Sequence, residues 1–191
     1  VDTKLWNPDF IKIAEQIGLI KPLTEWILQT VCDQMAVWNS EGFSDIHTAV
    51  NISPDHFLDK GLVSLITETL ETKGIAFNKL ELEVTESTVQ TNAQNLSAFQ
   101  RLKDLGISVA IDDFGTGYSS FSSLKHMNVD ILKIDKSFID DILTDEKTQV
   151  LVSSMIRMGH NLGYKIIAEG IESHAQLQLL QQLQCDIGQG Y

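Results

Sequence analysis

Short apolar segments alternate with longer amphipathic ones along this chain, and that alternation most constrains its fold. Six segments have the apolar, β-branched composition of buried strands. They end near Asn51, Glu83, Asp112, Lys133, Glu169 and Gln189. Between them, apolar residues recur at helical spacing, for example in 62–73, 93–105 and 147–162. Strands that alternate with helices over short connections predict a parallel sheet covered by helices.

Two architectures fit this count of strands, an open doubly wound sheet and a (β/α)8 barrel. The second would be incomplete, because such barrels need about 250 residues and the chain has 191. Each predicted strand ends on a polar residue, and barrel enzymes build their active sites at that end. We therefore expect an α/β fold with one domain over residues 1–191, a TIM-like barrel that lacks a strand and a helix. No GxGxxG follows the first strand, which weakens a dinucleotide-binding interpretation.

The charge of the chain limits its partners. The formal net charge is −12, which argues against binding to nucleic-acid polymers or to anionic membranes. No apolar run approaches the roughly 20 residues of a membrane span. Cys32 and Cys185 have no metal-ligand spacing, so a reduced, cytoplasmic location is the simplest interpretation. The first residue is not Met, which is typical of an excised piece.

The most informative stretch runs from Ile107 to Ser120, where a buried strand leads into Asp112 and Asp113. Adjacent carboxylates at a buried strand end repel each other, and a divalent cation would stabilise them. For an isolated pair, the alternative is that one aspartate caps the next helix. The other predicted strand ends favour the metal, because Asn51, Glu83 and Glu169 add oxygen ligands of the kind that Mg²⁺ and Mn²⁺ prefer.

Lys133 lies inside an apolar strand and needs an anion nearby. This anion is either a phosphate or a metal-bound hydroxide, or else a structural carboxylate such as Asp135. We expect Glu81 to be structural, and Glu172 to orient a loop or cap the following helix. His126 and His160 lie in predicted helices and are not expected to bind metal. The chain has no Ser-His-Asp or Cys-His arrangement that would indicate a covalent nucleophile.

Six motifs together resemble the EAL family of bacterial cyclic di-GMP phosphodiesterase domains. They are NIS at 51–53, ELEVTES at 81–87, DDFGTGYSS at 112–120, LKIDKSF at 132–138, AEGIES at 168–173 and QGY at 189–191. The resemblance covers essentially the whole chain in order. It implies a modified (β/α)8 barrel with one antiparallel strand, and signalling through hydrolysis of cyclic di-GMP to linear pGpG.

The resemblance also implies residue roles. Asn51, Glu83 and Asp112 would bind a first Mg²⁺ or Mn²⁺ ion, and Asp112 would bridge to a second ion held by Asp113 and Glu169. Lys133 and Glu169 would be catalytic, with Lys133 orienting water and phosphate, and Gln189 would contact substrate. Coupling of the site to dimerisation would involve a loop and the residues around it, namely Glu86, Phe114, Gly115, Thr116, Gly117 and Glu172.

The ends of the chain depart from the family pattern. The Glu-Ala-Leu signature, with a further metal-ligand glutamate, and the last helix are not in these 191 residues. We therefore expect the piece alone to hydrolyse cyclic di-GMP poorly and to associate through an open edge.

The alternative to an enzyme is a catalytically silent EAL-type receptor, and the intact ligand set favours the enzyme. A different barrel phosphoesterase would leave the six motif matches unexplained. Expected partners are cyclic di-GMP, a second copy of the chain, and sensor or diguanylate cyclase domains of a parent protein that could itself be membrane-anchored.

Overall fold

Six parallel strands form the centre of the protein in a computed structural model that describes residues 8–57, 59, 61–89, 93–117 and 129–191. The strands are β1 (Thr48–Asn51), β2 (Leu80–Thr85), β3 (Ser108–Phe114), β4 (Ile131–Ile134), β5 (Lys165–Ile171) and β6 (Ile187–Gly190). They lie in sequence order, and every neighbouring pair is parallel. A doubly wound sheet would instead reverse its order at a switch point.

The sheet is therefore a half-barrel, which confirms the expected incomplete TIM-like fold and excludes the doubly wound alternative. The antiparallel strand implied by the family resemblance is not among the described strands. The helix predicted around His126 lies outside the described residues.

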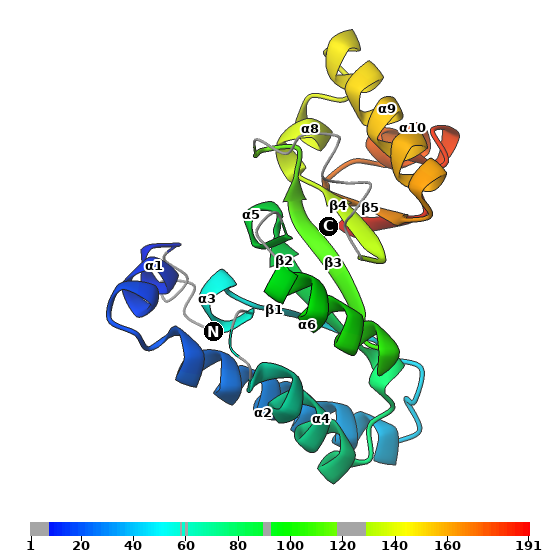
Figure 1. Cartoon of the computed structure of the whole chain (residues 1–191). Coiled ribbons are helices and arrows are strands. Elements are labelled where there is room, and N and C mark those ends of the chain that lie inside the picture. Colours follow the sequence, from blue (N-terminus) through cyan, green and yellow to red (C-terminus); the bar gives the residue numbers. More distant parts are fainter. Residues whose placement is uncertain (1–7, 58, 60, 90–92, 118–128) are drawn as a thin grey trace.

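Long helices cover one side of this curved sheet, as Figure 1 shows. They are α2 (Ile20–Ser40), α4 (Leu62–Lys73), α6 (Ala93–Asp104), α9 (Glu146–Leu162) and α10 (His174–Gln182). Helix α1 (Pro8–Gln16) instead packs against α2. Helix α2 packs on β1, α6 on β3, and α9 and α10 on β5. No helix of the described segments is long and apolar enough to cross a membrane.

Short helices that the sequence did not predict follow several strands directly. Helix α3 (Pro54–Phe57) comes after β1, α5 (Glu86–Val89) after β2, and α8 (Lys136–Asp140) after β4, while the 3-10 turn η2 (Phe77–Lys79) precedes β2. Three of them therefore lie at the carboxyl ends of strands, where they surround the expected site.

Local signals explain most helix ends. Helix α9 ends at Gly163, whose φ of 86° is the left-handed conformation that glycine adopts without strain. Ser173 and Gln176 form a capping box at the start of α10. Helix α2 begins at Ile20, two residues before Pro22. Proline is tolerated there because amide groups of the first turn have no intrahelical acceptor.

The two faces of the sheet differ in chemistry. The main core lies between the helices and the outer face, and it includes Leu82, Val109, Leu132 and Ile166. The inner face has a small separate cluster of Ala110, Ile131 and Ile167. Because side chains alternate along a strand, the residues two positions later on β3, β4 and β5 point the same way. Those residues are Asp112, Lys133 and Glu169, so the inner face becomes charged at its carboxyl end.

Candidate functional site

Lys133 occupies the centre of a cluster of carboxylates at the carboxyl ends of the strands. Its Nζ atom lies 2.5 Å from Glu83 Oε1, 2.7 Å from Glu169 Oε1 and 3.2 Å from Asp112 Oδ1. Only 4% of the Lys133 side chain is exposed. The partners come from β2, β3 and β5, so three parts of the chain distant in sequence converge on one ammonium group.

The partners of Lys133 exclude one possibility left open by the sequence, a structural pair with Asp135. Asp135 accepts hydrogen bonds from Ser137 N at 3.0 Å and from Ser137 Oγ, and so caps α8. It is therefore not the carboxylate that neutralises Lys133. The strand-end carboxylates do so instead.

Asn51 extends this cluster toward β1. Its Nδ2 atom donates a hydrogen bond of 2.9 Å to Glu83 Oε2, and Asn51 and Glu83 are register partners in neighbouring strands. Glu83 therefore has one oxygen on Asn51 and the other on Lys133. The structure brings together all three side chains expected at the first metal site, because Asp112 contacts the same lysine.

Strand β3 contains a bulge at the adjacent aspartates. Ile111 pairs with Leu132 and Phe114 pairs with Ile134, so Asp112 and Asp113 together face the single residue Lys133. Asp113 has a φ of 53°, a left-handed conformation that is rare outside glycine. In a regular strand neighbouring side chains point to opposite faces. Because of the bulge, the Asp112 and Asp113 carboxylates both lie at the carboxyl end of the inner face.

Strand β5 repeats the same arrangement. Ala168 pairs with Gly188 and Ile171 with Gly190, so Glu169 and Gly170 together face Gln189. Gly170 has a φ of 73°. Bulges are rare in parallel pairs and often lie next to active sites. Here each one coincides with a residue that the sequence placed in the site.

The bulges gather an acidic cluster that fits a divalent cation. Asp112, Asp113 and Glu169 each offer a carboxylate oxygen, and these atoms lie within 4.8 Å of one another. Burial raises the pKa of Asp113, and the charges of Asp112 and Asp135 raise it further. Burial also raises the pKa of Glu169, against the hydrogen bond from Lys133. Asp112 and Glu169 are half-buried and Asp113 is exposed. Crowded carboxylates of this kind are the hard oxygen ligands that Mg²⁺ and Mn²⁺ take.

Lys133 stays positively charged in this setting. Burial alone would lower the pKa of Lys133, but hydrogen bonds to Glu169 and Glu83 and the charge of Asp112 outweigh it, and the pKa is raised. Lys133 is therefore a permanent hydrogen-bond donor. Glu81 lies two residues before Glu83, and burial followed by the charge of Glu83 raises its pKa.

The loop after β3 lies against Glu86. Glu86 is buried, and its Oε2 accepts a hydrogen bond of 3.4 Å from Gly115 N. A side chain at Gly117 would meet the Glu86 carboxylate at about 3.0 Å. The other oxygen, Oε1, is buried without a hydrogen-bond partner among the described contacts. Glu86 thus packs against the loop at Gly115 and Gly117. Its role in coupling the site to dimerisation stays a prediction.

The other loop residues occupy different environments. Phe114 is buried at the end of β3, while Thr116 Oγ1 donates a hydrogen bond of 2.8 Å to Asp113 O. Gly115 packs beneath Phe138, where a side chain would collide. Tyr118, Ser119 and Ser120 of the same motif, and His126, lie outside the described residues.

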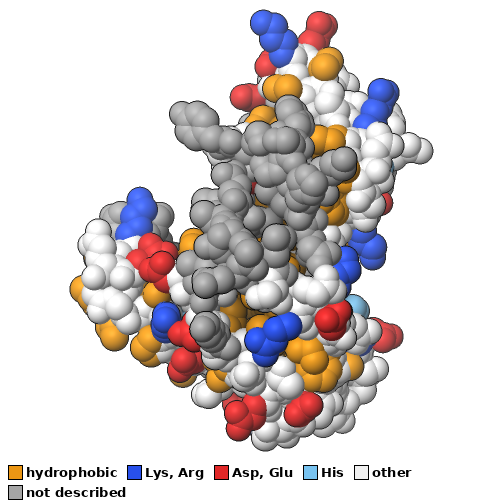
Figure 2. Space-filling model, viewed as in Figure 1, with side chains coloured by type: hydrophobic (Ala, Val, Ile, Leu, Met, Phe, Trp, Pro, Cys, Tyr) orange, Lys and Arg blue, Asp and Glu red, His pale blue; other side chains and the backbone are white. Residues whose placement is uncertain are grey.

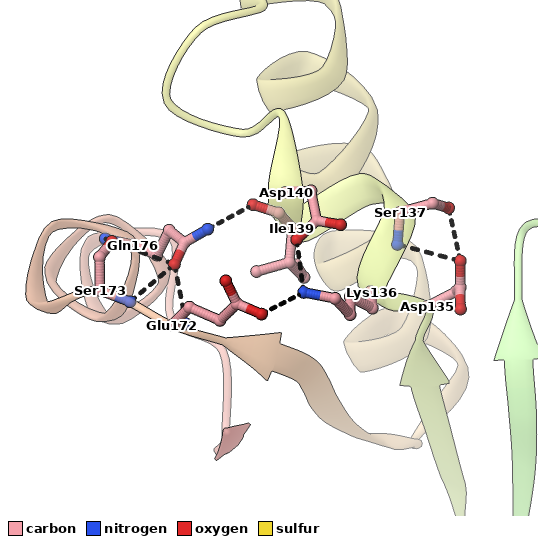
Figure 3. Close-up of polar contacts among 8 residues, drawn as sticks. All are labelled: Asp135, Lys136, Ser137, Ile139, Asp140, Glu172, Ser173 and Gln176. Atoms are coloured by element: carbon pink, nitrogen blue, oxygen red, sulfur yellow. Dashed lines mark hydrogen bonds and ion pairs between the residues drawn. The ribbon is translucent and has the colours of Figure 1, made fainter. Parts of the chain in front are cut away.

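Glu172 and Gln189 lie at the rim. Glu172 Oε1 forms an ion pair of 2.6 Å with Lys136 Nζ, drawn in Figure 3. Gln189 is exposed on the edge strand β6, opposite the bulge of β5. His160 is away from this cluster, since its Nε2 lies 2.8 Å from Asp186 Oδ2. That His160 does not bind metal stays a prediction.

Sequence reasoning missed two contributors near the site, Lys136 and the side chain of Gln176 beyond its capping role. Lys136 also pairs with Asp140 at 2.8 Å. The i,i+4 spacing of these two charges was a readable signal. By contrast, the Gln176 Nε2 hydrogen bond to Ile139 O at 2.9 Å joins two helices that are distant in sequence, and no local pattern indicates it.

Comparison with known proteins gives consistent matches over nearly the whole chain. The family described as EAL domain matches residues 4–191. "Signaling protein YkoW" of Bacillus subtilis is 44% identical over 96% of this chain and 23% of its own length. "Bifunctional diguanylate cyclase/cyclic di-GMP phosphodiesterase MucR" of Pseudomonas aeruginosa is 39% identical over 95% of this chain and 27% of its own length.

A solved structure matches the fold closely. The chain described as "PaMucR Phosphodiesterase, c-di-GMP complex" superposes with a TM-score of 0.89 at 39% identity, over 95% of this chain and 74% of that one. The present chain spans about a quarter of the length of the two curated relatives that it matches.

Proposed function

The chain belongs to the EAL domain family, and from this premise we propose that it hydrolyses cyclic di-GMP to linear pGpG with the help of two divalent cations, Mg²⁺ or Mn²⁺. The name of the MucR relative includes cyclic di-GMP phosphodiesterase, and the matching MucR structure is a complex with cyclic di-GMP. These names support the substrate class at the level of the family.

The observation that carries the proposal is the cluster around Lys133. An ammonium group 4% exposed and within 3.2 Å of three carboxylates is costly to assemble for stability alone. The cluster also includes more carboxylates than one lysine neutralises. Such a site is suited to bind cations and, through them and Lys133, an anionic phosphodiester.

The acidic cluster of Asp112, Asp113 and Glu169 supports one proposed ligand set, and the family resemblance supports the other. Asn51, Glu83 and Asp112 would hold one ion, and Asp112, Asp113 and Glu169 the other. Two divalent ions at a phosphodiester neutralise charge at phosphorus and lower the pKa of a bound water. The protein itself holds these oxygens on strand ends and bulges, which are more rigid than loops.

The catalytic roles differ between Lys133 and Glu169. The protonated ammonium group of Lys133 donates hydrogen bonds but cannot accept a proton. It can therefore orient a phosphate oxygen or the attacking water. Glu169 lies 2.7 Å from it and is a carboxylate. Glu169 is therefore the group of this pair that can take a proton from water.

Rim residues complete the proposal. Gln189 faces the β5 bulge and would contact the substrate. Glu86, the loop at 114–117 and Glu172 would transmit changes at the site to a dimer partner. The relatives' greater lengths and the name of MucR support sensor or diguanylate cyclase domains in the parent protein.

The test is hydrolysis of cyclic di-GMP by the purified chain in Mn²⁺ and in EDTA, with the product identified by chromatography. Glu169→Gln is the active-site variant, and Glu81→Gln, a neighbouring strand residue on the same face, is the matched control. We expect pGpG to form slowly and only with Mn²⁺, with no product from Glu169→Gln and the same slow rate from Glu81→Gln.

Two results would redirect the assignment. Binding of cyclic di-GMP without any product in Mn²⁺ would favour the receptor alternative. Product formation that persists in EDTA or in Glu169→Gln would contradict the proposed roles of the cations and of Glu169.

A further inference from the structure

The position of the Glu169 carboxylate depends on the residue that follows it. Glu169 and Gly170 form the bulge opposite Gln189, and Gly170 has a φ of 73°. A bulge lacks part of the regular ladder and bends its strand. Because the bulge faces the edge strand β6, it needs support from the other side, where α8 lies.

Lys136 of α8 supplies this support through its aliphatic stem. A Cβ atom on Gly170 would lie 2.8 Å from Lys136 Cβ and from Lys136 Cδ, and closer still to Cγ. The stem therefore covers the position where other residues carry a side chain. The Gly170 backbone and the Lys136 stem form one packed unit.

The charged end of Lys136 extends across the strand to the residue beyond the bulge. Its Nζ lies 2.6 Å from Glu172 Oε1 and 2.8 Å from Asp140 Oδ1. In Figure 3 the lysine points from α8 toward Glu172, at the end of β5. One side chain thus contacts the bulge and holds the residue two positions after it.

Gln176 holds the same segment from α10. Its Oε1 accepts hydrogen bonds from Glu172 N at 3.0 Å and Ser173 N at 2.9 Å, while its Nε2 donates to Ile139 O. Figure 3 shows that this amide bridges α10 and α8. The backbone after Glu169 is therefore tied to α8 by two side chains.

Two ion pairs lie side by side, because the two lysines are three residues apart and so are their two glutamates. Lys133 pairs with Glu169 inside the site, and Lys136 pairs with Glu172 at the rim. Both lysines come from one short segment, β4 followed by α8. We propose that Lys136 is a positioning residue that holds the β5 bulge and thereby sets the cation affinity of the Glu169 carboxylate.

This inference rests on the proposed function, since it concerns the same cation site. It makes a distinctive prediction, because the outer pair is exposed, with 47% of the Lys136 side chain and 60% of the Glu172 side chain accessible. Exposed ion pairs contribute little to stability. Removing the Lys136 charge should therefore weaken cation binding while leaving global stability nearly unchanged.

The experiment measures Mn²⁺ binding by titration calorimetry in the full 191-residue chain. Lys136→Met removes the charge and keeps an unbranched stem over Gly170, and Lys136→Arg restores the charge. Lys21→Met is the matched control, because Lys21 pairs with Asp59 at 2.7 Å with a similar exposed fraction of 44%. Removing groups that orient metal ligands weakens binding by about 10- to 100-fold.

We expect Lys136→Met to weaken Mn²⁺ binding by about tenfold, the low end of that range, because the effect passes through the backbone. Lys136→Arg should recover most of the affinity, and Lys21→Met should match the wild type. Unchanged affinity in Lys136→Met, or an equal loss in Lys21→Met, would overturn the proposal. So would a large loss of stability in Lys136→Met without cation, which would mark Lys136 as merely structural.

Hydrogen exchange without cation keeps this test separate from the proposed function. If the wild type binds no Mn²⁺, the metal role fails, but the bulge can still be followed at the amides of Gly170 and Ile171. Faster exchange there in Lys136→Met, with no change in Lys21→Met, supports the positioning role. Equal exchange in both variants overturns it.

Discussion

Lys133 is the residue whose replacement should separate chemistry from binding. In Lys133→Met, measured with saturating Mn²⁺ to compensate the carboxylates, we expect kcat to fall by about 100-fold or more, the size of losing one transition-state donor. The affinity for cyclic di-GMP should change much less. Lys165→Met, at the opposite end of β5, is the control.

Steady-state kinetics and equilibrium binding of cyclic di-GMP measure the two quantities. Lost binding with unchanged kcat would show instead that Lys133 anchors the substrate. Failure of the variant to fold even with Mn²⁺ would indicate a structural lysine.

Asp113 shows a local conflict at the same scale. Its φ of 53° and its raised pKa both disfavour the folded state at neutral pH. Residues with an unfavourable local conformation and no compensating contact are typical of functional sites. A bound cation would compensate here, since it would neutralise the Asp113 carboxylate.

His56 on α3 predicts a pH dependence of stability. Burial lowers the pKa of His56, although the charges of Glu25 and Asp59 oppose the shift. The unfolded state therefore binds more protons below the ordinary histidine pKa of about 6.5, so stability is full above that pH and falls as the pH decreases.

Urea unfolding between pH 8 and 5 measures this effect. The slope from one histidine is at most about 1.4 kcal/mol per pH unit. His56→Gln should flatten the curve in this range. An identical pH dependence in the variant would assign the effect to other groups.

At the scale of elements, the bulges of β3 and β5 turn a regular sheet into a site. Gly170→Ala tests the β5 bulge, because it adds both an unfavourable φ and a collision with Lys136. Gly163→Ala is the matched control, since Gly163 has a φ of 86° and nothing within 4 Å of the added atom.

The control should cost about 1–2 kcal/mol, the penalty of the left-handed conformation. Gly170→Ala should cost clearly more in urea unfolding, and it should also weaken Mn²⁺ binding. Equal costs for the two variants would show that the Lys136 stem moves aside freely.

For the whole molecule, the acidic mouth predicts that cations stabilise the fold. At 100 times its dissociation constant, Mn²⁺ should add about 2.7 kcal/mol. For a chain of this size this is roughly 5–10 °C in melting temperature. Thermal melts in Mn²⁺ and in EDTA measure the shift, and Asp113→Asn should reduce it. Unchanged melts at millimolar Mn²⁺ would contradict an intact site.

The half-barrel also has two edge strands, β1 and β6. Figure 2 shows hydrophobic side chains over α1 at one side of the molecule, and the exposed apolar residues there include Phe10, Ile13 and Ile17. Exposed edges and apolar side chains favour association with other chains. We expect the 191-residue chain to self-associate as its concentration rises.

Light scattering after size exclusion measures this association. Ile187→Lys places a charge on the β6 edge, where Ile187 is 44% exposed. Leu143→Lys, at a residue 49% exposed outside the sheet, is the control. Ile187→Lys should reduce association more than the control does, and equal effects would exclude the β6 edge as the contact.

Several features of the protein follow from local sequence. Strand and helix periods, the Ser173 capping box and the polar residue at each strand end depend on neighbours within a few positions, so they can be read directly. Helix α4 was predicted with its observed ends, Leu62 and Lys73. The resemblance of six motifs also gave the family, because those motifs combine chemistry with spacing.

Tertiary structure alone decided the rest. The order of the strands selected the half-barrel over the doubly wound sheet. The choice of Glu83, Asp112 and Glu169 over Asp135 as partners of Lys133 depends on three strands that meet only in the folded sheet. The two bulges, and the contact of Lys136 with Gly170, are set by register and packing between segments far apart in sequence. Local propensity carries no information about such contacts, because they form only when distant segments pack together in the folded chain.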